Sequence, residues 1–431
     1  MKSSRQTQAL RVPAFHPDVR RSELYAIRVN GRPLEVLATD WADFAPFSFS
    51  GSVAVEVLAK EPVESVVIRP KSRGVSGRVE DGRISFSLDA PDNFWIDIPG
   101  KKTLFLYANP LETAAPSPGD PNVRYFSSGQ IHETGVLEVS SGQTVYLEDG
   151  AVLKGCIHVK EAHDVAIAGY GVIDGGFFSK GAPGRKRTVL FDQCRNVSVR
   201  DICVINPSSW TVQLTGCHDS RVSNIKEIGD GGGSDGIDIC ACRDITVEGC
   251  MLRNGDDALV VKSFGGDVEN IGFTRCSIVN VGGGSAMEIG HELRADHVRN
   301  IAFRDCDVLC KHGYGAIFSI NDSDRASIEN IRYEDIRVEH YYNCLISLRI
   351  RESMWCRDAQ RGHVRNIHFK NISIINTQFN AGYSKSLIGG RDREHKIENV
   401  TIENLTIDGK KITDHDELDL YVKQADGIVF M

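Results

Sequence analysis

One phrase of about eleven residues recurs along the second part of the chain, and it limits the folds open to the protein. Each copy begins with Asn or Asp and then alternates apolar with polar residues, as in "NIGFTRCSIVN" and "NIHFKNISIIN". The copies begin at Asn196, Asp244, Asn270, Asn300, Asn330, Asn366 and Asn399. From Asn270 onward, consecutive starts lie 30, 30, 36 and 33 residues apart. A period of this length, built from short strands, indicates a solenoid whose coils stack their apolar faces.

No run in this region keeps a 3.6-residue period over ten or more residues, which excludes helical repeats. A right-handed parallel β-helix is therefore the expected fold, because it buries the inner face of each coil against the next. The Asn that opens each phrase is expected at a turn, where its side chain tolerates a left-handed backbone and can hydrogen-bond along the stack.

The first 110 residues follow another pattern, with short period-two runs such as "SVAVEVLA", "RISFSL" and "TLFLYA" separated by turn residues. Asn30–Gly31 is a strong hairpin signal. We therefore expect a small antiparallel β-sandwich over residues 1–110. Residues 111–125, rich in Pro and small polar residues, are expected to be a linker. The β-helix is then expected over residues 126–431.

The net charge of −8 and the pI near 5.9 give no basic footprint, which argues against nucleic acid or an anionic membrane as a partner. The sequence contains neither a signal-peptide core nor an apolar window of the roughly 18–20 residues that a membrane span needs. These features predict a cytoplasmic protein. They leave the oligomeric state open, and a homo-oligomer is compatible with them.

All 12 cysteines lie from Cys156 onward, many within strand-like runs. Their spacing, as in "CAC" and "CDVLC", is not the paired C-x-x-C of a zinc site. Free cysteine packs as a small apolar side chain, so buried thiols are expected. No disulfide, metal or cofactor is predicted.

Two acidic clusters stand within "GGGSDGIDICACRDITVEGCMLRNGDD", the first at Asp235 and Asp238 and the second at Asp256 and Asp257. A lone Gly-Asp pair is usually a turn. However, Asp235 and Asp256 are 21 residues apart, close to one coil, and residues one coil apart lie about 4.8 Å from each other. Asp235, Asp256 and Asp257 are thus expected to converge, with at least one raised pKa. Such a set suits glycoside hydrolysis, which needs a protonated acid beside an ionised carboxylate.

The series "SDGIDI", "NGDDALVVKS" and "GGGSAMEIG", with "NPSSWTVQL" before it, resembles the polygalacturonase family, glycoside hydrolase family 28. The resemblance runs from about Arg124 to the C-terminus. A sandwich followed by a β-helix is also similar to the dextranase family, which shares the fold and the inverting mechanism. The resemblance implies that Asp256 is the general acid and that Asp235 and Asp257 activate water.

The chain departs from the family's pattern at several positions. Gly233 stands where the family has Asn, and Ser285 stands where it has His. Ile317 and Ser319 stand where it has the Arg and Lys that hold a galacturonate carboxylate. These departures predict a neutral or differently charged sugar. The alternative is that the bases come from elsewhere, namely from Arg349, Arg351 or Arg391.

Six further residues are expected to contact substrate: Asp238, Lys262, Glu288, His291, Trp210 and Arg391. Asp238 alternates with Asp235, although a structural turn carboxylate would look the same. Lys262 would project near the same surface, either to a sugar hydroxyl or to solvent. Trp210 could stack on a sugar ring or pack in the core.

These observations favour an inverting glycoside hydrolase that acts on short oligosaccharides, from a chain end, on a neutral or non-galacturonate sugar. The alternatives are a galacturonide-type pectin oligosaccharide hydrolase, a polysaccharide lyase or epimerase, and a non-catalytic carbohydrate-binding β-helix.

Overall fold

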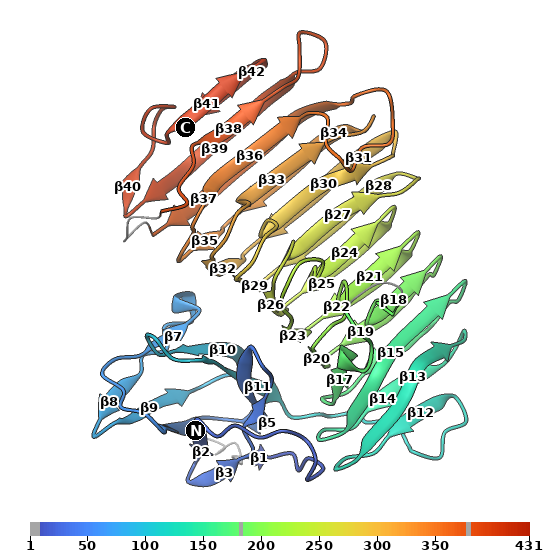
Figure 1. Ribbon diagram of the computed structural model, residues 1–431, viewed down its shortest axis with the longest axis vertical. Helices are drawn as coiled ribbons and strands as arrows, with labels where there is room; N and C mark the ends of the chain where they lie inside the picture. The colour runs from blue at the N-terminus through green and yellow to red at the C-terminus, as the bar shows by residue number, and fades with distance from the viewer. Residues whose placement is uncertain (1–8, 181–183, 376–380) are drawn as a thin grey trace, which may run out of the picture. The chain divides into compact units, whose positions relative to one another are not determined.

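The computed structural model describes residues 9–180, 184–375 and 381–431, which consist almost entirely of strands, turns and loops (Figure 1). The helical elements in these ranges are two 3-10 turns, Lys71–Arg73 and Gly175–Phe177. No helix in this described part of the chain is long and apolar enough to cross a membrane. The chain divides into two compact units. One comprises Met1–Glu133, Val145–Lys154 and Gly169–Val172, and the other comprises Thr134–Thr144, Gly155–Ala168 and Ile173–Met431.

The first unit contains the β-sandwich. One of its sheets has the order β3 (Arg32–Leu34), β2 (Tyr25–Val29), β6 (Val53–Ala59), β9 (Arg83–Leu88), β8 (Arg78–Glu80). The other has the order β1 (Ala9–Arg11), β5 (Ala42–Ser50), β11 (Thr103–Pro110), β10 (Asp92–Asp97), β7 (Val67–Arg69), with β4 (Leu37–Ala38) beside β5. Pairing is antiparallel except between β5 and β11. Asn30 and Gly31 have positive φ at the β2–β3 hairpin, as their turn requires.

The apolar residues of the alternating runs face the interior of the sandwich, where Ile27, Val55, Phe47, Phe94 and Leu106 are buried in one cluster. The period-two pattern therefore identified the inner faces of both sheets.

The second unit is a right-handed parallel β-helix in which strands of successive coils pair along three faces (Figure 1). The first face is formed by β18 (Val189–Asp192), β21 (Val212–Thr215), β24 (Ile237–Cys240), β27 (Leu259–Ser263), β30 (Met287–Leu293), β33 (Ala316–Asp322), β36 (Cys344–Ile350), β38 (Ser386–Gly389) and β41 (Leu420–Lys423). The second is formed by β19 (Ser198–Arg200), β22 (His218–Ser223), β25 (Arg243–Glu248), β28 (Val268–Thr274), β31 (His297–Arg304), β34 (Ser327–Glu334), β37 (His363–Ile374), β39 (Ile397–Ile407) and β42 (Ala425–Phe430).

The third face is formed by β20 (Cys203–Ile205), β23 (Lys226–Ile228), β26 (Met251–Asn254), β29 (Ser277–Asn280), β32 (Asp307–Lys311) and β35 (Arg337–Val338), which pairs with the end of β37. The remaining strands are β12 (Val123–Phe126), β13 (Ile131–Val139), β14 (Thr144–Leu147), β15 (Val152–Lys160), β16 (Ala166–Ala168), β17 (Val172–Asp174) and β40 (Lys410–Lys411).

An asparagine ladder runs along the second face, as the repeat predicts. We use this name for Asn270, Asn300, Asn330, Asn366 and Asn399. All five have φ of 58° or 59°. From Asn300 onward, each side-chain amide donates to the amide oxygen of the preceding member at 3.1–3.3 Å, and the amide of Asn270 donates to Asp244 Oδ1 at 2.9 Å. The ladder thus fixes the same corner in every coil.

The interior of the coils is stacked in the same regular way. Phe273, Phe303, Tyr333 and Phe369 lie ring on ring, with centroids 4.7–5.1 Å apart and planes within 8°. All 12 cysteines are free thiols and ten are buried, which confirms their expected packing role. The regular core makes the coil a repeating unit of fixed height, and this places residues of successive coils side by side.

Candidate active site

Four aspartates gather just before and within the first-face strands β24 and β27. We call Asp235, Asp238, Asp256 and Asp257, together with Lys262, the acid cluster. Ile237 pairs with Leu259, so this coil has 22 residues. The backbone N–H of Gly236 donates to the carbonyl of Asp257 at 2.9 Å.

The clusters therefore converge, but in a register that differs by one residue from the expected one. Asp235 is the lateral neighbour of Asp257, whereas the 21-residue spacing had placed it opposite Asp256. The difference arises because strand pairing, and not motif spacing, sets the coil length at this point.

Lys262 links three of the carboxylates. Its register partner in the preceding coil is Cys240, so its side chain projects from the outer face beside Asp238. The ammonium donates to Asp235 Oδ2 at 2.7 Å and lies 3.4 Å from Asp238 Oδ1 and 3.8 Å from Asp257 Oδ2. Lys262 and all three acids are buried. One cation is thus shared by three acids that are largely withdrawn from water, with Asp257 the most exposed of the three.

Burial and crowding together favour the protonated form of these carboxyl groups. Burial, followed by repulsion from Asp235, raises the pKa of Asp238 well above its ordinary value. Burial, followed by repulsion from Glu288, does the same to the pKa of Asp257. Burial alone lowers the pKa of an ammonium, but the carboxylates outweigh it and raise the pKa of Lys262. The cluster can therefore hold protons at pH values where free aspartate has none.

Asp256 differs from its neighbours because it is partly exposed. The backbone N–H of Gly233 donates to Asp256 Oδ2 at 2.6 Å, and the N–H of Asp257 donates to Oδ1 at 3.1 Å. Gly233 is the position where the resemblance expects Asn, so the chain supplies a backbone donor to the acid there. At Gly255, a Cβ atom would lie 2.2 Å from the nitrogen of Gly231, so only glycine allows these loops to stack.

Glu288, expected from the sequence to contact substrate, lies on β30, the first-face strand next to β27. It pairs in register with Val260, is buried, and accepts a hydrogen bond from Asn321 Nδ2 at 2.9 Å. Ser285, which stands where the family has His, donates its backbone N–H to Asp257 Oδ1 at 2.7 Å.

His291 follows on the same strand, β30, opposite Asp322 of the next coil. Burial lowers the pKa of His291, and the largest effect acting against this comes from the charge of Glu288. His291 is therefore close to the acid cluster and favours the neutral imidazole.

Trp210 lies beside the acid cluster but is packed into its wall. The guanidinium carbon of Arg187 lies 4.0 Å from the indole centroid, and Lys262 Nζ lies 4.2 Å from it. The ring of Phe264 stacks on the indole with the ring centroids 6.1 Å apart, and Trp210 as a whole is only 8% exposed. Of the two roles considered for Trp210, packing is the one that this geometry favours, because cation–π contacts occupy the ring.

Arg391 is not brought to the acid cluster. It follows β38, four strands along the first face from β27, and pairs with Glu352 at 2.8 Å and Asp392 at 3.7 Å. Ion pairing with these loop residues accounts for it without a substrate.

Arg349 and Arg351, the other bases considered, lie on and just after β36. Both are partly buried, and their Nε atoms have no hydrogen-bond partner within the described residues.

One buried carboxyl group near the acid cluster, that of Glu227, was not predicted from the sequence. Glu227 is fully buried in β23, and Thr211 Oγ1 donates to it at 2.6 Å. Burial raises the pKa of Glu227 well above its ordinary value, and Asp235 adds to the effect. The signal that could have revealed it is the charged pair Lys226–Glu227, which stands between the apolar residues Ile225 and Ile228.

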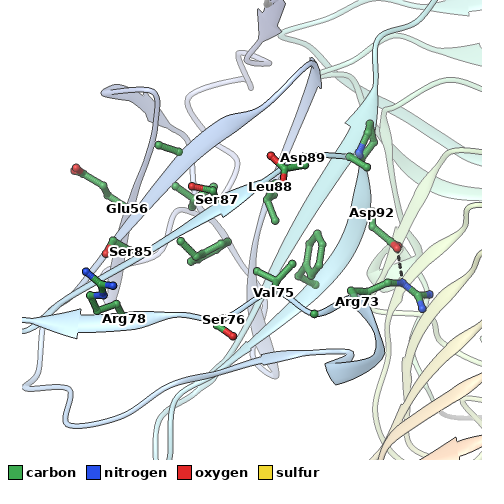
Figure 2. Close-up of a pocket in the computed structure, with 17 residues that line it drawn as sticks. Glu56, Arg73, Val75, Ser76, Arg78, Ser85, Ser87, Leu88, Asp89 and Asp92 are labelled. Carbon is green, nitrogen blue, oxygen red and sulfur yellow. Dashed lines mark hydrogen bonds and ion pairs between the residues drawn. The ribbon is translucent and has the colours of Figure 1, made fainter.

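A polar cavity of about 670 Å³ lies in the sandwich (Figure 2). Its charged side chains have local partners: Arg73 donates to Asp92 at 2.6 Å, and the hydroxyl of Ser52 donates to Asp89 at 2.6 Å.

Within the described residues, no three His, Cys, Asp or Glu side chains are arranged to hold a metal ion.

Residues 128–418 match the model of the family described as Glycosyl hydrolases family 28, which is more than half of the chain. The chain belongs to glycosyl hydrolase family 28. The resemblance seen in the acidic motifs is thereby confirmed, and this family 28 protein is a glycoside hydrolase.

Two individual relatives of this family 28 chain illustrate the match. An exopolygalacturonase of Zea mays is 23% identical over 297 residues, which are 64% of this chain and 68% of that protein. The structure of a hyperthermoactive exopolygalacturonase from Thermotoga maritima is 18% identical and covers 72% of this chain and 84% of its own, with a TM-score of 0.57.

Dex49A from Penicillium minioluteum is 15% identical with a TM-score of 0.65, and the match covers 98% of this chain and 96% of that one. At these identities the structural likeness concerns the fold alone.

Proposed function

We propose that this family 28 protein is an inverting hydrolase that removes a neutral sugar from the end of short oligosaccharides. The observation that carries the proposal is the sharing of Lys262 by Asp235, Asp238 and Asp257. A cytoplasmic location, which the sequence predicts, fits short substrates because polymers do not enter cells intact.

In this proposal Asp256 is the general acid, and Asp235 and Asp257 activate water. Partial exposure allows Asp256 to reach a glycosidic oxygen. Asp257 and Asp235 are lateral neighbours, and both lie within 4 Å of Lys262 Nζ. Their proximity to one cation lets one of the pair be ionised while the other holds a proton.

The reaction follows from these roles. The bond between the anomeric carbon and the glycosidic oxygen breaks, and its electron pair goes to the oxygen, which takes the proton of Asp256. A water molecule attacks the anomeric carbon from the opposite face and gives its proton to the pair formed by Asp235 and Asp257. Proton exchange with solvent then restores Asp256. A single displacement of this kind inverts the anomeric configuration.

The preference for a neutral sugar rests on the charge of the site. Five carboxyl groups, those of Asp235, Asp238, Asp256, Asp257 and Glu288, outnumber the two cations that act on the aspartates, the Lys262 ammonium and the Arg187 guanidinium. A uronate at the cleaved ring would add another negative charge to this surface, at a cost that grows in a buried site. The Arg and Lys that bind such a carboxylate in the family pattern are Ile317 and Ser319 here.

A second candidate, a galacturonide hydrolase, is favoured by Arg349 and Arg351. Their Nε atoms are buried without a hydrogen-bond partner in the described structure, and guanidinium groups bind carboxylates well. The name of the Zea mays relative points in the same direction.

A screen of neutral nitrophenyl glycosides, short neutral oligosaccharides and short galacturonate oligomers, with the released anomer followed by NMR, tests both candidates. We expect a neutral substrate to be cleaved and the inverted anomer to appear first. A retained anomer would overturn the mechanism, and faster cleavage of galacturonate oligomers would favour the second candidate. A product that absorbs in the near ultraviolet, and whose formation is abolished by EDTA, would instead indicate a lyase.

A further inference from the structure

Three buried polar residues stand in register beneath the acid cluster, at the ends of the third-face strands β26, β29 and β32. Asn254 pairs with Asn280, and Asn280 pairs with Lys311. All three residues are fully buried, at 0% exposure. We call them the donor column.

The donor column is directed at the backbone of the loops that follow these strands. Asn254 Nδ2 donates to the carbonyl of Asp256 at 2.5 Å and to that of Asp257 at 2.8 Å. Asn280 Nδ2 donates to the same carbonyl of Asp256. The carbonyl of Asp256 is thus held from two successive coils.

Lys311 acts on the next loop along the stack. Its ammonium donates to the carbonyls of Gly313 and Tyr314, each at 3.2 Å. Burial lowers the pKa of Lys311 to about 8, although the weaker effects of Cys310, Asp257, Cys344 and Asp256 act in the opposite direction. The loop carrying Tyr314 therefore depends on a buried cation that can lose its charge in a mildly alkaline solution.

Apolar side chains would fill these three places more cheaply, because burying an amide or an ammonium costs free energy even when its hydrogen bonds are made. Neighbouring interior positions, such as Leu252, Ile278 and Leu309, are apolar. The polar residues occur where the loops need donors, and glycine-rich loops have little side-chain packing of their own to fix their carbonyls.

We propose that Asn254, Asn280 and Lys311 are positioning residues for the hydrolysis: they hold the backbone of Asp256 and Asp257 and of the adjacent loop in the reactive arrangement. The inference rests on the roles proposed for Asp256 and Asp257. Displacement of a reacting group by about 1 Å can cost on the order of a hundredfold in rate, which gives such residues a large effect without any contact to substrate.

The test compares Asn280→Leu and Lys311→Met with the unaltered full chain, using the best substrate of the glycoside screen. Both replacements keep the approximate side-chain size and remove the donor. For Asn280→Leu we expect kcat to fall about 10- to 100-fold with KM changed less than about threefold, and the midpoint of thermal unfolding to stay the same or rise. Asn280→Ser, which is too short to reach the carbonyl of Asp256, is expected to give the same kcat loss and serves if the leucine variant does not fold.

The pH profile gives a second readout. Below pH 8 Lys311 is charged and holds its loop, so in the unaltered protein kcat/KM should decline as the pH rises through about 8. Lys311→Met should have a lower kcat/KM without this decline. Cys344, which also faces Lys311, has a pKa raised by burial and therefore titrates at higher pH.

Asn300→Gly is the matched control, because it removes one asparagine of the surface ladder and glycine tolerates its positive φ. It should lower thermal stability and leave kcat and KM unchanged. Unaltered kcat in Asn280→Leu and Asn280→Ser, or a kcat loss in Asn300→Gly as large as theirs, would overturn the inference. If Asp256→Asn also kept full activity, the proposed function itself would be wrong. If Asp256→Asn lost activity while the donor-column variants kept it, only the positioning role of the donor column would be refuted.

Discussion

In the sandwich cavity each charge has a nearby partner at the surface, whereas in the acid cluster three buried aspartates share one lysine. Arg73 and Asp92 pair at 2.6 Å with about a quarter of each side chain exposed. Lys262 and Asp238 are 6% and 0% exposed. Both regions are polar, but only the second gathers more acidic than basic side chains in a buried place. Folding gains nothing from such an arrangement, so we take the imbalance, rather than polarity or cavity volume, as the mark of the reactive region.

The contrast between the two regions would be wrong if their acids contributed equally to catalysis. Asp256→Asn should lower kcat about 10²- to 10⁴-fold, the usual contribution of a general acid, with the protein still folded. Asp92→Asn in the sandwich cavity should leave kcat unchanged. Steady-state kinetics with the best substrate of the screen measures both. Equal losses, or none in Asp256→Asn, would contradict the assignment.

The second prediction concerns stability. Lys262→Met should lower the free energy of unfolding by about 3–5 kcal/mol at pH 7, because it leaves buried carboxylates without their cation. Arg73→Met, which breaks a pair with about a quarter of each side chain exposed, should cost about 1 kcal/mol or less. Urea unfolding of the two variants gives the values. Similar costs would mean that the charges of the acid cluster are balanced in some other way.

A smaller effect is expected for Asp238→Asn, and its sign depends on pH. The native pKa of Asp238 is raised, so the folded state holds a proton that the unfolded state releases above its own pKa of about 3.9. Stability due to this group is therefore present at low pH and is lost as the pH rises above about 4. Asparagine does not titrate, so the Asp238→Asn variant does not lose this stability as the pH rises. Its midpoint of thermal unfolding should match the parent near pH 4 and exceed it by a few degrees at pH 8; a gap that is largest at pH 4 would contradict the raised pKa.

The smallest effect is expected from the sandwich cavity. Ser87, which lines it, is exposed, so Ser87→Leu should change stability by less than about 0.5 kcal/mol. It should also leave kcat/KM within about twofold. Calorimetry and kinetics on this variant would detect an unsuspected role of the cavity as a larger change in either quantity.

The repeat made most of the β-helix predictable, because an asparagine with positive φ and an alternating apolar run impose the same corner and the same inner face in every coil. The convergence of Asp235 with the Asp256–Asp257 pair followed from that period. The register did not, since one residue more or less in a loop leaves the motif intact while shifting its neighbours. The register is set by the pairing of the strands, and a single amino-acid sequence does not show which residues pair.

The support of the acid cluster was harder to foresee. Asn254 and Asn280 each end a copy of the repeated phrase, so a signal was present, but polar residues at strand ends usually face solvent. Only the fold shows that these side chains turn inward to the loop carbonyls. Likewise, nothing in the sequence indicates that Trp210 is covered by Arg187 and Lys262, because a packed indole and an open one have the same sequence neighbours.

The asparagine ladder also determines where the protein can change. Asn330 and Asn366 are 36 residues apart, more than the 30 of the two preceding intervals, yet their amides still bond at 3.3 Å. The additional residues are absorbed between β36 and β37, directly after Arg349 and Arg351, and the ladder continues undisturbed. Loop length is thus uncoupled from coil geometry. A lineage could lengthen or replace this segment, and so alter which sugars are accepted, without displacing the aspartates three and four coils away.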